Sequence, residues 1–147
     1  MLLWRISNYK TLDGIGGLLA SGRWHSRGRP ILYCTENPST SLLEILVYIE
    51  IDSEDRPERF QVLKIEGPDS LSVETVSLDP IPDMPETQAI GDEWLASGRS
   101  LLLRVPSVLV PETSNILVNP AHPEAARLRI AKVYHHAFDP RLLSMSR

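Results

Sequence analysis

The feature that most constrains this fold is an almost continuous apolar run at residues 42–49, LLEILVYI. A helix that is apolar on nearly all sides is typical of a protein interior. The hydroxyl side chains of residues 39–41 precede the run and can cap the first turn of such a helix. The run therefore predicts a buried helix, and Glu44 is the only carboxylate in it.

Glu44 has two interpretations. It lies three residues after Ser41, which is the spacing of a capping box, so it can face solvent at the start of the helix. A carboxylate inside a protein is costly unless it is paired or hydrogen-bonded. Glu44 can therefore instead point into a polar cleft and meet Arg23 or Arg5.

A short strand is predicted just before this helix. Residues 30–34 (PILYC) include branched and aromatic side chains, and turn-forming residues flank them. The segment 22–47 thus reads as turn, strand, turn and helix. It brings Arg23, Tyr33 and Glu44 into one supersecondary unit.

The rest of the chain predicts short mixed elements. Twelve prolines in 147 residues argue against a helical bundle and favour an α+β fold. We expect a helix at 87–97 that Gly91 weakens or ends, and a strand at 101–110 that Pro106 confines to a sheet edge or a bulge. Further expected elements are strands at 2–6, 60–65, 70–76 and 130–136, a charged loop at 52–59, and irregular or turn segments at 78–86, 119–123 and 138–142.

Size and charge restrict the classes of function. A length of 147 residues suits one domain, here residues 1–147, and a net charge of −4 argues against a general nucleic-acid binder. The sole cysteine, Cys34, excludes an intramolecular disulfide and is expected to be a packed thiol in a reducing cytoplasm. We expect neither a secretory signal nor a membrane span, because the apolar runs are too short.

The residue types leave several chemistries open. The four histidines lack metalloprotease spacing, which argues against a metal enzyme, and no GxSxG nucleophile motif is present. The glycine-rich residues 14–17 lack the Lys-Ser/Thr of a P-loop. An arginine can hold a diphosphate, a tyrosine ring can pack on a heteroaromatic ring, and a carboxylate can stabilise an oxocarbenium-like centre. One chemistry that fits this set is cleavage of an N-glycosidic bond in a dinucleotide such as NAD.

Several short motifs make the chain resemble the RES-domain family, which supplies the toxins of bacterial Xre–RES toxin–antitoxin pairs. These motifs run through most of the chain in family order: Trp4-Arg5-Ile6, Gly22-Arg23-Trp24, Pro30-Ile31-Leu32-Tyr33, Ser41-Leu42-Leu43-Glu44, Val105-Pro106-Ser107, Leu117-Val118-Asn119-Pro120-Ala121-His122-Pro123 and Phe138-Asp139-Pro140-Arg141-Leu142.

The resemblance implies a fold similar to ADP-ribosyltransferase toxins, with small central mixed or antiparallel sheets and flanking helices. It implies an enzyme that consumes NAD as its substrate, without a cofactor. In family terms Arg23, Tyr33 and Glu44 fall on the catalytic pattern, and Arg5 and Ser107 are expected to bind NAD. The expected partner is an Xre-type helix-turn-helix antitoxin that covers the active site, while the chain itself binds no nucleic acid.

Three functions stay open at this point. The chain can cleave NAD by hydrolysis or phosphorolysis, it can transfer ADP-ribose to a macromolecule, or it can be an inactive module that only binds its partner. The intact Arg, Tyr, Glu and Ser positions argue against the inactive module. The apolar stretches 101–103 and 108–110 exceed what a small sheet needs, which suggests a homodimer or an antitoxin contact.

Overall fold

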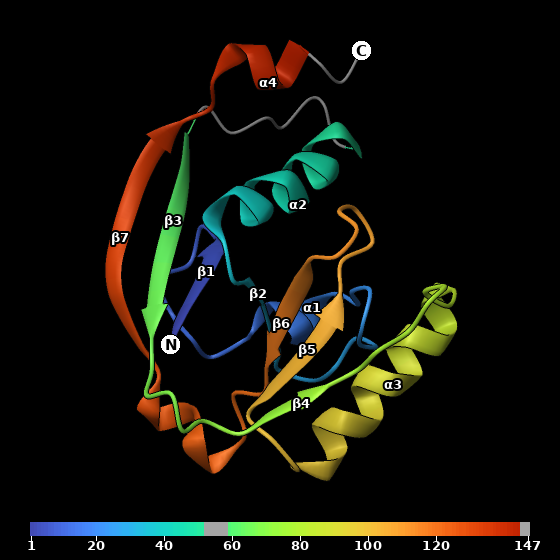
Figure 1. Cartoon of the computed structure of the whole chain (residues 1–147). Coiled ribbons are helices and arrows are strands. Elements are labelled where there is room, and N and C mark those ends of the chain that lie inside the picture. The colour runs from blue at the N-terminus through green and yellow to red at the C-terminus, as the bar shows by residue number, and fades with distance from the viewer. Residues whose placement is uncertain (52–58, 145–147) are drawn as a thin grey trace.

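The structure is a computed structural model that describes residues 1–51 and 59–144. Its strands form one mixed sheet of order β4-β5-β6-β2-β1-β3-β7, flanked by helices (Figure 1). This confirms the α+β prediction, with one sheet in place of several small ones. The elements are β1 (Leu2–Ile6), α1 (Gly16–Leu19), β2 (Leu32–Thr35), α2 (Pro38–Ile51), β3 (Arg59–Glu66), β4 (Val73–Thr75), α3 (Met84–Ser97), β5 (Leu102–Pro106), β6 (Ser114–Val118), the 3-10 helix η1 (Pro123–Arg127), β7 (Arg129–Ala137) and α4 (Pro140–Ser144).

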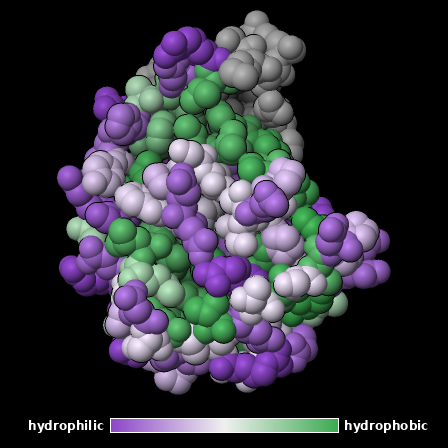
Figure 2. All heavy atoms as spheres, in the orientation of Figure 1, coloured by the Kyte–Doolittle hydropathy of each residue, from purple (hydrophilic) through white to green (hydrophobic). Residues whose placement is uncertain are grey.

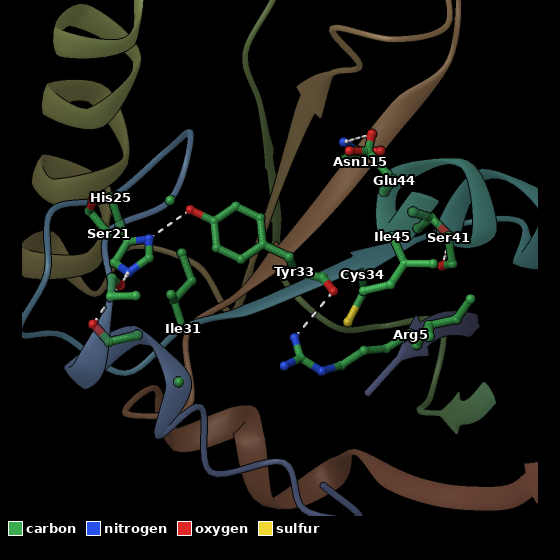
Figure 3. Close-up of a pocket in the computed structure, with 16 residues that line it drawn as sticks. Arg5, Ser21, His25, Ile31, Tyr33, Cys34, Ser41, Glu44, Ile45 and Asn115 are labelled. Atoms are coloured by element: carbon green, nitrogen blue, oxygen red, sulfur yellow. Dashed lines mark hydrogen bonds between the residues drawn. The ribbon is translucent and has the colours of Figure 1, made fainter. Parts of the chain in front are cut away.

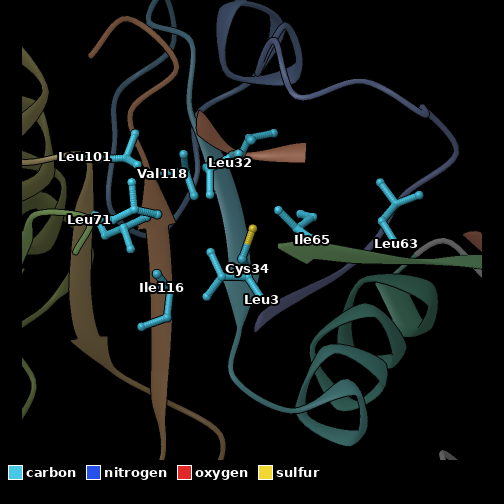
Figure 4. Packing of buried hydrophobic residues seen from close by; sticks show 11 residues of the cluster. Leu3, Leu32, Cys34, Leu63, Ile65, Leu71, Leu101, Ile116 and Val118 are labelled. Carbon is cyan, nitrogen blue, oxygen red and sulfur yellow. The ribbon is translucent and has the colours of Figure 1, made fainter. Parts of the chain in front are cut away.

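Apolar side chains cover both faces of this sheet. Successive residues of a strand point to opposite faces, so Leu102 joins one core cluster and Leu103 the other. The cluster around Leu102 is shown in Figure 4. Because residues 101–103 are fully buried, the suggestion that this stretch forms a contact surface is wrong.

Helix α3 packs directly against the backbone near Trp24. We expected Gly91 to weaken or end this helix, but α3 continues through it. A Cβ at Gly91 would overlap the carbonyl oxygen of Trp24, so the glycine is what allows this close approach. Asp83 caps the helix start by accepting a hydrogen bond from the backbone N–H of Glu86.

Helix α2 begins four residues earlier than the apolar run. The side chain of Asn37 accepts a hydrogen bond from the N–H of Ser39 and so caps the first turn. Ser41 lies inside the helix, where its hydroxyl contacts Thr35 and donates to the carbonyl of Trp4. The proposed capping box between Ser41 and Glu44 is therefore wrong.

One face of α2 is exposed, although the sequence predicted a helix buried on all sides. Leu43 and Val47 lie one helical turn apart and are 45% and 40% exposed. Figure 2 shows apolar side chains gathered over α2. Val108 and Leu109, in the loop between β5 and β6, are also exposed.

Strands β1 and β2 part after a single paired position. Trp4 pairs with Thr35, whereas β1 pairs with β3 along its whole length. The sheet therefore opens between β1 and β2, and α2 follows directly after β2 at this opening. This local divergence positions the candidate site.

Several boundaries differ from the sequence predictions. Strand β4 is shorter than residues 70–76, and the chain turns after Pro106 and resumes as β6 at Ser114. A short helix, α4, occupies most of the predicted closing turn. The charged loop at 52–59 lies outside the described residues except for Arg59, which begins β3. Among the helices described, none is long and apolar enough to cross a membrane.

Candidate functional site

A pocket of about 260 Å³ lies where β1 and β2 part (Figure 3). Its walls come from β1, β2, β6, α1, α2 and the segment after α1. The side chains in these walls that can bind a ligand or take part in a reaction are those of Arg5, His25, Tyr33, Glu44 and Asn115. The structure thus brings together three of the five residues that the sequence singled out.

Glu44 reaches the pocket from α2 and is fixed by a residue of β6. Its Oε1 accepts a hydrogen bond of 2.9 Å from Asn115 Nδ2. The Asn115 amide must turn its donor toward Glu44, because a carboxylate only accepts hydrogen bonds. Asn115 Oδ1 is buried and makes no hydrogen bond within the described part of the chain. The expected ion pair between Glu44 and an arginine is absent from the described residues, and Asn115 takes its place.

Arg5 projects from β1 into the same pocket. Its Nη1 donates to the backbone carbonyl of Tyr33 at 3.3 Å. This side chain therefore reaches a carbonyl of β2 next to the point where the two strands part. Arg5 Nε is buried without a hydrogen bond among the described residues, so the guanidinium keeps unused donor capacity.

Tyr33 also lines the pocket, and Figure 3 shows its ring between His25 on one side and Glu44 and Arg5 on the other. Its hydroxyl lies 2.6 Å from His25 Nδ1 and accepts from the N–H of Trp24 at 3.1 Å. Tyr33 and Asn115 lie on the same face of the sheet, because Tyr33 is paired with Leu117 and Asn115 with Thr35. The ring and the Glu44 carboxylate thus belong to one side of the opening.

Arg23 and Ser107 are placed outside the residues that line the pocket. Arg23 Nη2 donates to the carbonyl of Pro82 at 3.1 Å. The Ser107 hydroxyl accepts from the N–H groups of Leu109 and Val110, so it organises the loop between β5 and β6. Their expected roles in catalysis and in NAD binding stay predictions.

Cys34 is a packed thiol that belongs to a buried hydrophobic cluster and borders the pocket, as expected. Burial raises its pKa to about 11, and the nearby charge of Arg5 offsets only part of that shift. The thiol is therefore protonated at neutral pH and is a poor nucleophile.

Sequence reasoning did not identify Asn115 or His25 as site residues, nor Gly22, which leaves room for the Tyr33 hydroxyl. Asn115 lies 71 residues from Glu44, and no local pattern signals such a contact. The family motif around Arg23 includes Gly22 but gives it no role, and His25 follows that motif directly. Within the described residues, no cluster of three or more His, Cys, Asp or Glu side chains could hold a metal ion.

Comparisons with known proteins agree on one family. A model of the RES domain matches residues 2–140. A Toxin Res of Pseudomonas putida (strain KT2440) is 46% identical over an alignment of 133 positions that covers 88% of this chain and 92% of that protein. A Prs ADP-ribosylating toxin of Sphingobium sp. (strain YBL2) is 36% identical over an alignment of 141 positions, which covers 90% of this chain and 86% of that protein.

The fold has a solved counterpart with low sequence identity. The crystal structure of the M. tuberculosis MbcT–MbcA toxin–antitoxin complex contains a chain that superposes with a TM-score of 0.74 at 15% identity. The match covers 99% of this chain and 88% of that chain. From the extent of the domain match and the identity to its relatives, this chain belongs to the RES-domain family.

Proposed function

We propose that this chain is the toxin of a toxin–antitoxin pair and that it depletes NAD in the cytoplasm by cleaving the bond between nicotinamide and ribose. Family membership and the names of its relatives support the toxin role. The observation that carries the chemistry is the Glu44 carboxylate, which Asn115 holds in a pocket that Tyr33 and Arg5 also line.

In this proposal Glu44 stabilises positive charge. The C1′–N1 bond of NAD breaks, its electron pair leaves with nicotinamide, and an oxocarbenium-like centre forms on the ribose. A carboxylate can stabilise such a centre and can accept the proton of an attacking water. Water then gives ADP-ribose, nicotinamide and one released proton, and inorganic phosphate would give the phosphorolysis product instead.

The pocket suits one end of the dinucleotide. Its volume of about 260 Å³ lies just below the usual range for small-molecule sites, roughly 300–1,000 Å³. We assign the nicotinamide and its ribose to the pocket, with the Tyr33 ring against the nicotinamide. Arg5 would meet the pyrophosphate at the pocket edge, and Arg23 and Ser107 would act with it if substrate binding rearranges their segments. The reaction needs NAD only as substrate and no further cofactor.

A second reaction is supported by one relative. The Sphingobium protein is called a Prs ADP-ribosylating toxin, and it is 36% identical to this chain. Transfer of ADP-ribose breaks the same C1′–N1 bond, and a nucleophilic side chain of a protein takes the place of water. Glu44 would keep its role in that reaction, so the two functions differ only in the acceptor.

The exposed apolar side chains near the pocket support an antitoxin partner. Leu43 and Val47 lie on α2, which also carries Glu44, and Leu18 and Leu19 lie on α1, which also lines the pocket. We propose that a helix-turn-helix antitoxin covers these residues. A Leu43→Glu, Val47→Glu double variant would then retain nicotinamide release and escape neutralisation by the antitoxin encoded beside it.

The purified chain should be incubated with NAD, with and without inorganic phosphate, while nicotinamide release is followed. Release without phosphate supports hydrolysis, and release that requires phosphate supports phosphorolysis. If no nicotinamide appears, mass spectrometry of proteins from induced cells tests ADP-ribosyl transfer. Absence of both nicotinamide and a modified protein would contradict the proposed function.

A further inference from the structure

We propose that His25 is a positioning residue that fixes the ring of Tyr33 through the tyrosine hydroxyl. This inference rests on the proposed function, in which the Tyr33 ring packs on the nicotinamide end of NAD. Three neighbouring residues enclose the hydroxyl: Gly22, Trp24 and His25. We call this group the hydroxyl socket.

The hydrogen bonds of His25 define its tautomer. Its Nε2 lies 3.0 Å from the carbonyl oxygen of Ala20 and 3.3 Å from that of Gly17. Carbonyl oxygens only accept, so Nε2 carries a proton. In the neutral ring Nδ1 is then an acceptor, and it accepts a hydrogen bond from the Tyr33 hydroxyl, whose oxygen lies 2.6 Å away (Figure 3). His25 is 2% exposed, so these bonds are shielded from water.

Gly22 and Trp24 complete the socket. The N–H of Trp24 donates to the hydroxyl oxygen at 3.1 Å. A Cβ at Gly22 would overlap that oxygen and lie 2.8 Å from Tyr33 Cζ, so only glycine leaves room for it. The segment is itself braced, because Gly22 N–H donates to the His25 carbonyl and Gln88 Nε2 of α3 donates to the Gly22 carbonyl.

The socket links three parts of the pocket wall. Through Nε2, His25 contacts carbonyls of Gly17 in α1 and Ala20 at its end, and through Nδ1 it contacts Tyr33 of β2. The hydroxyl proton lies on the bond to His25, so Tyr33 works with its ring face and not as an acid toward the substrate. His25 therefore acts on the substrate through the orientation of the Tyr33 ring.

Two isosteric substitutions separate this role from simple support of the fold. In His25→Asn the amide oxygen takes the position of Nδ1 and can still accept from Tyr33. In His25→Gln the amide reaches the position of Nε2 and can still donate to the carbonyls, but the acceptor for Tyr33 is lost. We expect His25→Asn to retain kcat/KM for nicotinamide release within about threefold, and His25→Gln to lose about tenfold or more, mainly in KM.

The same pair at His122 is the matched control. His122 Nδ1 also accepts a backbone N–H, from Glu124, but this histidine lies outside the pocket. We expect both His122 variants to retain wild-type kinetics. Equal losses in His25→Asn and His25→Gln, or a larger loss in His25→Asn, would overturn the proposal, since the carbonyl contacts would then be what matters.

A readout that needs no activity separates this inference from the proposed function. Nitrogen NMR of the imidazole should show His25 as the Nε2–H tautomer, with an Nδ1 signal that shifts in Tyr33→Phe. If the wild type releases no nicotinamide, the proposed NAD reaction is contradicted. The NMR result by itself then tests whether His25 holds the Tyr33 hydroxyl. An Nδ1–H tautomer, or an Nδ1 chemical shift that is the same in the wild type and in Tyr33→Phe, would contradict the proposed hydrogen bond between His25 and Tyr33.

Discussion

The two ends of the pocket are held in different ways. At the Tyr33 end, the hydroxyl lies between a backbone N–H and a buried imidazole, and α3 braces the segment behind it. At the Glu44 end, one hydrogen bond from Asn115 holds the carboxylate. Arg5 Nε and Asn115 Oδ1 there are buried and lack hydrogen bonds within the described residues.

This difference separates positioning from chemistry. Buried polar atoms are usually hydrogen-bonded, and unpaired ones are common where a ligand completes the site. The Tyr33 hydroxyl already has its bonds and contributes to the fold, whereas the Glu44 end keeps donors and acceptors for substrate. Substitutions at the Glu44 end should therefore change activity with little effect on stability, and substitutions at the Tyr33 end should change both.

The largest expected effect is that of Glu44→Gln. The amide oxygen still accepts from Asn115, so we expect the free energy of unfolding to change by less than about 1 kcal/mol. Loss of the carboxylate charge should lower kcat for nicotinamide release by about 10³-fold. Chemical denaturation and initial rates measure the two quantities.

Glu36→Gln is the matched control for Glu44→Gln. Glu36 is half-exposed, pairs with Arg104 at the surface and is not among the residues that line the pocket, so its loss should leave the rate unchanged. A Glu44→Gln protein that still releases nicotinamide at the wild-type rate would contradict the role given to the Glu44 end.

Gly22→Ala should lower both activity and stability. The new methyl group must displace the Tyr33 hydroxyl from its socket. Overpacking of this kind costs about 1–3 kcal/mol, and a ring displaced by about 1 Å can lower the rate about 10²-fold. Gly16→Ala is the control for stability, because its methyl group would meet nothing within 4 Å. Equal stability of the two variants would show that the Tyr33 end is not tightly packed.

Asn115→Leu tests how much one hydrogen bond matters at the Glu44 end. Leucine has a similar size but cannot donate to Glu44 Oε1. We expect kcat/KM to fall by about tenfold or more, because a hydrogen bond to a charged group contributes roughly 1.5–3 kcal/mol and each 1.36 kcal/mol is about a factor of ten. Thermal unfolding should change little, since the substitution also removes a buried oxygen without a partner. If Asn115→Leu lost much stability and kept normal kinetics, the Glu44 end would contribute to the fold and not to the reaction, contrary to the comparison above.

Local patterns predicted the elements well, but not the contacts between distant segments. The predicted strands at 2–6, 60–65 and 130–136 correspond to β1, β3 and β7, and the predicted helix at 87–97 corresponds to α3. The exposed face of α2 could not be foreseen, because an apolar run does not say which of its residues a neighbour covers. Likewise, a glycine within a helix signals weakness locally, whereas Gly91 is in fact a contact with Trp24.

The candidate site was predicted in part for the same reason. Tyr33 and Glu44 were singled out because their predicted strand and helix are adjacent in the sequence, and the structure places both side chains in the lining of the pocket. Arg5 was named first as a possible partner of Glu44 and then through its family motif. Asn115 reaches Glu44 only because β6 pairs with β2, which is a property of the strand order and not of any local spacing.

The smallest effect at neutral pH is expected at Cys34, which lies on β2 beside Tyr33. Burial raises the pKa of this thiol from 9.0 to about 11, while the charge of Arg5 acts to lower it. A raised pKa in the folded state means that the contribution to stability is complete below pH 9 and is lost as the pH rises toward 11. Between pH 8 and 11 the free energy of unfolding of the wild type should thus fall by about 2 kcal/mol more than that of Cys34→Ala. Urea denaturation of both proteins measures this difference. Parallel pH dependence in the two proteins would show that water reaches the thiol, and so that the buried cluster beside the pocket is open to solvent.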